Sequence, residues 1–294
     1  MSGFAKKIAL LALLACCASC ARADPPKPLL WKVSDADNEI YLLGSFHLLK
    51  PTDYPLPAAS SAAFEDAEKL VLELSPGELN DPGVTKKMAT AAQLRGRTLD
   101  QVLPAATWRQ LQAYTAKRGI PLANLQGYEP WFVSLLVSLT EIQRYGLDPK
   151  LGLDRHFAEL ASTAGKPVIG LETAAQQIAL FDGMSSKEQE QALQDTLDDL
   201  DGFDEAIART HEQWRAGDGD ALFNELGLDM KDKYPQLYRR INVDRNISWM
   251  PTLQALLDDS HGDDTLVVVG TLHLLGEDGV VARLKAKGYK VERL

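Results

Sequence analysis

The chain has 294 residues, of which 45% are hydrophobic and 24% are charged, and its formal net charge is −10. This composition supplies enough apolar surface for a folded core and excludes a chain that is disordered throughout. The acidic balance argues against nucleic acid and against an anionic membrane surface as partners, because the chain has no cationic surplus with which to release bound counterions.

The first 23 residues have the pattern of an export signal. Lys6 and Lys7 form its positive end, residues 8–15 form an apolar stretch, and residues 21–23 fit the small-x-small cleavage pattern. A transmembrane helix would need a longer apolar run. We therefore expect residues 24–294 to form a single exported domain.

All three cysteines, Cys16, Cys17 and Cys20, lie in or beside this signal. The domain that follows therefore has no disulfide and no thiolate nucleophile. Residues 13–16 resemble a bacterial lipobox, so a lipid anchor at Cys16 is the alternative to soluble export. Both alternatives predict a protein that works outside the cytoplasm, either in a bacterial periplasm or secreted.

The domain begins with a predicted edge strand at residues 31–33, a hairpin turn and a second strand at residues 39–44. The second strand ends at Gly44, where glycine permits a sharp turn, and His47 follows three positions later. One such GxxH pattern is weak evidence, because a single histidine after an apolar run more often has a structural role.

Two short apolar strands are predicted to carry acids. Residues 70–74 contain Glu73, and residues 168–172 end at Glu172. A carboxylate in a buried strand costs free energy unless it binds a metal, a cation or several donors. The carboxyl ends of strands are also where open α/β sheets bind their ligands. Both glutamates are therefore candidate site residues.

The middle of the chain is predicted to be helical. Helices open at Pro104 and Pro130, and the second is almost wholly apolar but too short to span a bilayer, so we expect it in the core. Another helix begins at about residue 152, with Asp154 as its predicted cap. Residues 185–215 continue the helical pattern, with Ser185 and Glu188 at capping-box spacing.

The last main strand, at residues 265–270, carries a second copy of the histidine motif. Gly270 ends it and His273 follows, and residues 268–275 match residues 42–49 in apolar or hydroxyl character at every position. Two imidazoles at equivalent strand ends would suit a metal or proton-transfer site. The strand-helix-strand order at both ends predicts an α/β fold, with a central mixed or mostly parallel sheet flanked by helices and a helical middle region.

These motifs resemble the TraB/GumN group of bacterial proteins, which is related to the Tiki metalloproteases of animals. The resemblance covers residues 31–294 and rests on the two GxxH motifs and on the residues at 73–76, 170–173 and 244–246. It implies that His47 and His273 bind a divalent metal together with an acid, for which Glu73 is the candidate. It favours manganese or cobalt, and it matches the family arginine and asparagine to Arg245 and Asn246.

The residue types suit hydrolysis. Two neutral imidazoles with one or two carboxylates can bind manganese, cobalt, iron or zinc. Such a metal lowers the pKa of its bound water and polarises a carbonyl group. We expect Glu172 to be the general base and Arg245 to stabilise the oxyanion. The supporting residues are Gly44, Ser45, Gly270, Thr271 and Asn246, which shape the turns or hydrogen-bond near the metal ligands.

The sequence leaves three hypotheses. The first is an exported metal-dependent hydrolase, with peptides as its favoured substrates. The alternative is a non-catalytic binding or regulatory protein that captures a peptide or small molecule in the same cleft. The third is a haem or metal carrier, which would be coloured when purified. A serine hydrolase is not supported, because the chain has no GxSxG motif. The oligomeric state stays open.

Overall fold

The computed structural model describes residues 24–258 and 262–294. The predicted export signal and the cysteines at positions 16, 17 and 20 lie outside the described residues. Within the described chain, every helix is too short or too polar to cross a membrane.

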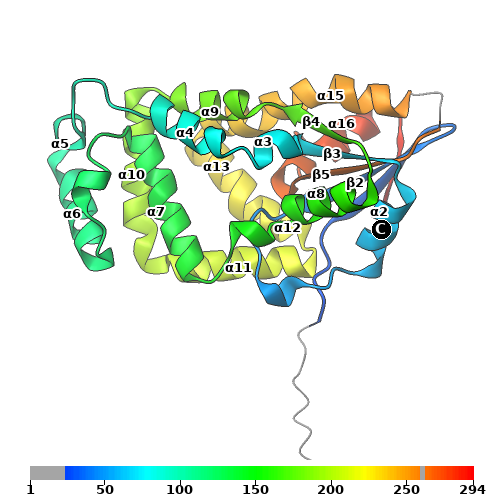
Figure 1. Ribbon diagram of the computed structural model, residues 1–294, viewed down its shortest axis with the longest axis horizontal. Coiled ribbons are helices and arrows are strands. Elements are labelled where there is room, and N and C mark those ends of the chain that lie inside the picture. The colour runs from blue at the N-terminus through cyan, green and yellow to red at the C-terminus, as the bar shows by residue number, and fades with distance from the viewer. Residues whose placement is uncertain (1–23, 259–261) are drawn as a thin grey trace, which may run out of the picture.

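Six strands of the described chain form one mixed sheet, on the right of Figure 1. Their bounds are β1 Leu30–Ser34, β2 Glu39–Ser45, β3 Lys69–Leu74, β4 Val168–Glu172, β5 Thr265–Gly270 and β6 Lys290–Arg293. The order across the sheet is β4-β3-β5-β2-β1-β6. The first four of these are parallel to one another, whereas β1 is antiparallel to both of its neighbours. The predicted α/β fold class is therefore confirmed.

One strand prediction is wrong. The strand at residues 31–33 was expected at the edge of the sheet, but β6 covers it, with Trp31 paired to Arg293. The last backbone amide, that of Leu294, donates to Leu30 O at 2.9 Å. The reason is that the chain returns to the sheet after its last helix, and period-2 patterning alone does not reveal which strand it will join.

Helices cover the sheet and bury its apolar side chains. These helices are α2 Ala58–Asp66, α8 Leu153–Ala164, α11 Phe203–Ala216, α15 Asp244–Leu257 and α16 Val280–Ala286. The largest core cluster joins Leu42 and Val268 of the central strands to Phe157, Trp214 and Trp249 of the helices. The parallel strands are thus buried, as their continuous apolar runs predict.

A helical region, on the left of Figure 1, has a core of its own. It contains α5 Leu99–Val102, α6 Ala105–Arg118, α7 Pro130–Arg144 and α10 Ser186–Asp198. Leu111 and Tyr114 of α6 pack with Val133 of α7 and Leu193 of α10. Glycine in the left-handed conformation ends α6 at Gly119, as expected for a helix C-terminus.

The remaining elements are short and connect these layers. They are α3 Pro76–Leu79, α4 Pro82–Ala91, α9 Ala174–Asp182, α12 Gly219–Leu222, α13 Asp229–Lys233, α14 Pro235–Tyr238, the π-helical turns Phe223–Leu228 and Arg239–Val243, and the 3₁₀ turns Pro51–Asp53, Leu122–Asn124, Pro149–Leu151, Asp199–Gly202 and Thr271–Leu274. The predicted capping box is formed, because Ser185 N donates to Glu188 Oε2 at 2.7 Å. The predicted helix over residues 185–215 is divided, because the turn Asp199–Gly202 separates α10 from α11.

Candidate functional site

The parallel strands bring the predicted site residues to one edge of the sheet. Ser45 of β2 pairs with Gly270 of β5, and Leu74 of β3 pairs with Glu172 of β4. A Cβ atom added to Gly270 would lie 3.2 Å from both His47 Nε2 and Glu73 Oε1 and 3.5 Å from a carbon of the His273 ring. Three predicted ligands therefore converge beside the bare Cα of Gly270, where any side chain would crowd them.

The two histidine motifs also contact each other directly. Thr271 Oγ1 donates to Ser45 O at 2.9 Å. A Cβ atom at Gly44 would lie only 2.8 Å from that hydroxyl oxygen, so glycine permits the close approach of the two strands. The indole of Trp214 fixes the same turn by donating to Gly44 O at 3.0 Å. Gly44 and Thr271 thus hold the two strand ends together and shape the site indirectly.

His47 lies at the open side of the site, and 53% of its side chain is exposed. Its Nδ1 donates to Asp154 Oδ2 at 2.6 Å, and Ser45 Oγ donates to the same oxygen at 2.7 Å. The Asp154 carboxylate raises the pKa of His47 to about 9. The other ring nitrogen, Nε2, lies 3.8 Å from Glu73 Oε1. Asp154 therefore fixes the ring so that Nε2 faces Glu73.

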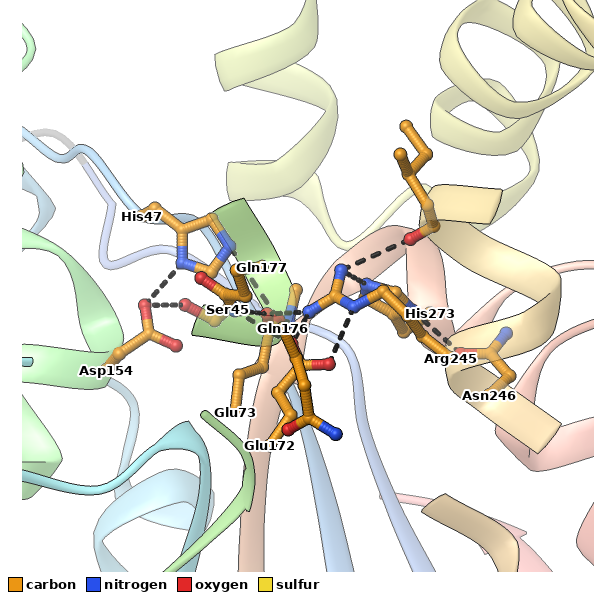
Figure 2. Close-up of polar contacts among 12 residues, drawn as sticks. Ser45, His47, Glu73, Asp154, Glu172, Gln176, Gln177, Arg245, Asn246 and His273 are labelled. Carbon is orange, nitrogen blue, oxygen red and sulfur yellow. Dashed lines mark hydrogen bonds and ion pairs between the residues drawn. The ribbon is translucent and has the colours of Figure 1, made fainter. Parts of the chain in front are cut away.

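His273 is buried on the opposite side of the site, as Figure 2 shows. Its Nδ1 donates to Asn246 Oδ1 at 2.7 Å. The Asn246 amide donates in turn to Asn242 Oδ1 and Asp278 O, which fixes its orientation. Burial lowers the pKa of His273 to about 3, so the ring is neutral and Nε2 carries a lone pair. The Trp249 ring packs against it, with centroids 4.5 Å apart.

Two glutamates share one guanidinium between these histidines (Figure 2). Arg245 Nη2 donates to Glu73 Oε2 at 2.5 Å and to Glu172 Oε1, and its Nε donates to Glu172 Oε2 at 3.1 Å. Arg245 Nη1 donates to the free nitrogen of His273 at 2.8 Å. A side-chain amide from α9 completes the network, because Gln177 Nε2 donates to Glu172 Oε1 at 2.8 Å.

Glu73 is ionised in this arrangement. Burial by itself raises the pKa of a carboxyl group, but the neighbouring charges, including His47 and Arg245, and the Gly270 backbone N–H outweigh it and hold the pKa of Glu73 at about 2. The Gly270 N–H donates to Glu73 Oε1 at 2.7 Å. Glu73 therefore presents a permanent negative charge between the two imidazoles.

The residues present fit a divalent cation. Each histidine gives Nδ1 to an oxygen acceptor, an arrangement that is typical of metal-binding histidines because it fixes the tautomer and the ring orientation. Imidazole nitrogen and carboxylate oxygen suit a transition ion. Arg245 at present contacts Glu73, Glu172 and His273, so a metal could bind here only if the guanidinium released His273 and if His47 lost its Nε2 proton.

A second acidic cluster lies elsewhere on the sheet. Ligand oxygens of Glu39, Asp66 and Asp264 all lie within 4.8 Å of one another, and among the described residues this is the one set of three that meets that spacing. His47, Glu73 and His273 do not meet this spacing as a set of three, although His47 Nε2 lies 3.8 Å from Glu73 Oε1. The triad could bind a metal, although Lys32 Nζ donates to Glu39 at 2.7 Å and Tyr41 Oη donates to Asp66 at 2.6 Å. Nothing in the sequence pattern singled it out.

Sequence reasoning assigned Asp154 to helix capping rather than to the site, and it missed three further site residues. Gly152, not Asp154, is the N-cap of α8, and the buried Asp154 carboxylate binds His47 and Ser45 instead. The other missed residues are Gln177, Asn242 and Trp249. An acid in the first turn of a helix has an ordinary capping explanation, so the sequence carried no signal that Asp154 would face a strand end.

The comparisons with known proteins agree with the predicted resemblance. A family model described as TraB/PrgY/gumN matches residues 29–293. The chain belongs to this family. Its family assignment is therefore confirmed over nearly the whole described domain.

Individual relatives are distant. The chain is 24% identical over 250 residues to "Uncharacterized protein YbaP" of Escherichia coli (strain K12), with 85% of this chain and 89% of the relative covered. It is 25% identical over 246 residues to the protein of the same name in Shigella flexneri, with 83% and 87% covered. It is also 25% identical over 326 aligned positions to "Metalloprotease TIKI homolog" of Amphimedon queenslandica, covering 94% of this chain and 63% of that one. No solved structure matches.

Proposed function

We propose that this chain is a metal-dependent hydrolase that acts on peptide bonds after residues 1–23 have exported it from the cytoplasm. One observation carries the proposal. His47 and His273 each have Nδ1 held by an oxygen acceptor, His47 Nε2 lies 3.8 Å from Glu73 Oε1, and the guanidinium of Arg245 joins His273 Nε2 to the same carboxylate. The relative named as a metalloprotease supports the same reaction class. The pattern of residues 1–23 supports the export step.

In this proposal, His47, His273 and Glu73 would hold the ion. Manganese or cobalt is favoured by the family resemblance, and zinc or iron would suit the same donors. A divalent ion bound there lowers the pKa of water and polarises a carbonyl oxygen.

The neighbouring side chains would orient the two imidazoles and transfer protons. Asp154 and Asn246 hold the two imidazoles in the tautomer that presents Nε2. Release of Arg245 from His273 and Glu172 would free both the Glu172 carboxylate and the Arg245 guanidinium. Glu172 could then take a proton as general base, and Arg245 could donate to an oxyanion. Gln177 would keep Glu172 in place, because it donates to the same carboxylate at 2.8 Å.

The position of Arg245 favours a second candidate function. The guanidinium already satisfies Glu73, Glu172 and His273 without a metal. A site that kept this arrangement would capture a peptide or small molecule without cleaving it, as a binding or regulatory protein.

Hydrolysis of a peptide library by the mature chain, with and without a chelator, tests the proposal. We expect activity to disappear with the chelator, to return with manganese or cobalt, and to be absent in Glu73→Gln. The matched control is Glu39→Gln, which alters the second acidic cluster and should retain activity. A folded wild type that binds peptides but cleaves none with any of the four metals would favour the binding function instead.

A further inference from the structure

A pocket of about 270 Å³ opens beside the candidate site, with His47 and Glu73 in its wall. Four apolar residues form much of the rest of the lining, namely Leu72, Leu74, Leu79 and Pro149. Pockets for drug-sized ligands span about 300–1,000 Å³. A space of this size therefore suits one terminal amino-acid residue rather than a large molecule.

Arg155 of α8 also lines this pocket, and its hydrogen-bond partners are neutral. Its Nη1 donates to Asn80 Oδ1 at 2.8 Å and its Nη2 donates to Leu79 O at 3.0 Å. Among the described residues, Arg155 has no carboxylate within ion-pair distance, and a guanidinium has five N–H donors. It can therefore bind an anion from outside the chain.

The carboxylates that line the same pocket already have cationic partners. Asp154 is paired with His47 at 2.6 Å, and Glu73 is paired with Arg245 at 2.5 Å. Neither acid pairs with Arg155, so the Arg155 guanidinium has no charged partner among the residues that line the pocket. Its position in the first turn of α8 places an incoming anion near the positive end of the helix dipole.

We infer that this pocket binds the C-terminal residue of a peptide, with Arg155 binding the terminal carboxylate and the apolar wall contacting an apolar last side chain. Planar carboxylates match the guanidinium fork, which can donate two parallel hydrogen bonds to them. Because His47 and Glu73 share the pocket, the nearest cleavable bond is the last one, so the chain acts as a carboxypeptidase.

In that reaction, the C–N bond of the last amide breaks, a C–O bond forms from water, and one proton of the water goes to the leaving amine. The cleavage step rests on the proposed hydrolase function. The binding step does not, since it needs only the pocket and Arg155.

Binding of three dansylated probes to the full chain tests the inference. Dansyl-Ala-Leu has a free terminal carboxylate, dansyl-Ala-leucinamide has none, and dansyl-Ala-Glu-amide carries its carboxylate on the side chain. Fluorescence anisotropy without added metal should show the first probe binding about tenfold more tightly than the second, as expected for a charge-assisted hydrogen bond. Equal binding of these two, or tighter binding of the third than the first, would overturn the inference.

Arg155→Gln should remove the difference between the first two probes, and Arg155→Lys should retain part of it. Arg109→Gln is the matched control, because this exposed side chain donates to Ala105 O of its own helix and does not line the pocket, and it should keep the full difference. An unchanged preference in a folded Arg155→Gln contradicts the inference. If Arg155→Gln does not fold, Arg155→Lys replaces it in the test, and a preference equal to that of wild type contradicts the inference.

Adding manganese then separates the two proposals. Release of leucine from dansyl-Ala-Leu alone supports both. A binding preference with no release supports the carboxylate site and contradicts the carboxypeptidase step, whereas the hydrolase is contradicted only if the peptide library is also left uncleaved with all four metals. Cleavage of the first two probes at equal rates supports the hydrolase and overturns the carboxypeptidase inference.

Discussion

Two buried carboxylate networks, one in each half of the molecule, use the same residue types with opposite charge balance. In the helical region, Glu141 accepts hydrogen bonds from two arginines and a tyrosine at distances of 2.5–2.8 Å, the donors being Arg118, Arg144 and Tyr114. At the strand ends, two carboxylates, Glu73 and Glu172, share the guanidinium of Arg245.

The difference indicates what each network does. A carboxylate with two cations and a hydroxyl donor is fully paired, so the Glu141 network serves packing between helices. At the strand ends, the Arg245 guanidinium pairs with Glu73 and Glu172. The His47 ring, whose pKa is about 9, pairs with Asp154. These three carboxylates and two cations leave one negative charge in a buried place, which is costly unless a further cation binds there. This difference supports the proposal that the strand-end network binds a cation, whereas the helical network contributes to stability.

Removing the shared guanidinium should have the largest effect. Arg245→Ala leaves two carboxylates without their common partner, and we expect the free energy of unfolding to fall by roughly 3 kcal/mol at pH 7. Manganese should restore more of this loss than it adds to wild type, because the ion replaces the missing charge. Urea unfolding with and without the metal measures both effects, and a variant as stable as wild type would break the comparison.

Neutralising one carboxylate in each network compares them directly. Glu141→Gln should destabilise by roughly 2 kcal/mol, because the buried carboxylate loses its charge-assisted hydrogen bonds to Arg118 and Arg144. Glu172→Gln should change stability by less than about 1 kcal/mol, since Arg245 keeps Glu73 and a like charge is removed. Equal losses in urea unfolding of the two variants would mean that both networks are structural.

Asp154→Asn tests the residue that orients His47. We expect it to lower the affinity for manganese by about 10- to 100-fold without unfolding the chain, as for other partners of metal-binding histidines. Calorimetric titration gives the affinity, with Asp148→Asn as a control because Asp148 caps the neighbouring 3₁₀ turn without contacting His47. Undiminished affinity in Asp154→Asn would place the metal away from His47.

The smallest expected effect is a pH dependence of the helical network. Burial raises the pKa of Glu141, but hydrogen bonds from Arg118, Tyr114 and Arg144 outweigh it and hold the pKa below its ordinary value of 4.5. Glu141 therefore contributes stability that is fully present above about pH 4.5 and is lost as the pH falls further through the folded-state pKa. Glu141→Gln should make urea unfolding less dependent on pH between 5 and 3; an unchanged dependence contradicts this account.

Strand-end residues were predictable from the sequence because a short apolar run fixes both the strand and where it stops. That reasoning selected Glu73, Glu172, His47 and His273, and the structure brings all four to one edge of the sheet. The glycine that ends a strand also marked a place where other residues approach the backbone closely, as His47 and Glu73 do at Gly270.

Partners supplied by helices could not be predicted in this way. Asp154 lies 107 residues from His47 and Arg245 lies 172 residues from Glu73, so their meeting depends on how helices pack rather than on any local pattern. The prediction that residues 31–33 form an edge strand was wrong for the same reason, because β6 pairs with β1 and the order of the whole sheet decides which strands lie at its edges.

Metal binding by the mature chain, with His47→Ala and His273→Ala beside wild type, tests the central claim most directly. Circular dichroism confirms that each variant stays folded, and elemental analysis with calorimetry gives the metal content and affinity. We predict that wild type binds about one manganese, cobalt or zinc ion and that both folded variants lose it. Wild type that binds no divalent ion above background, or folded variants that keep the ion, would contradict the claim that the two histidines share one metal.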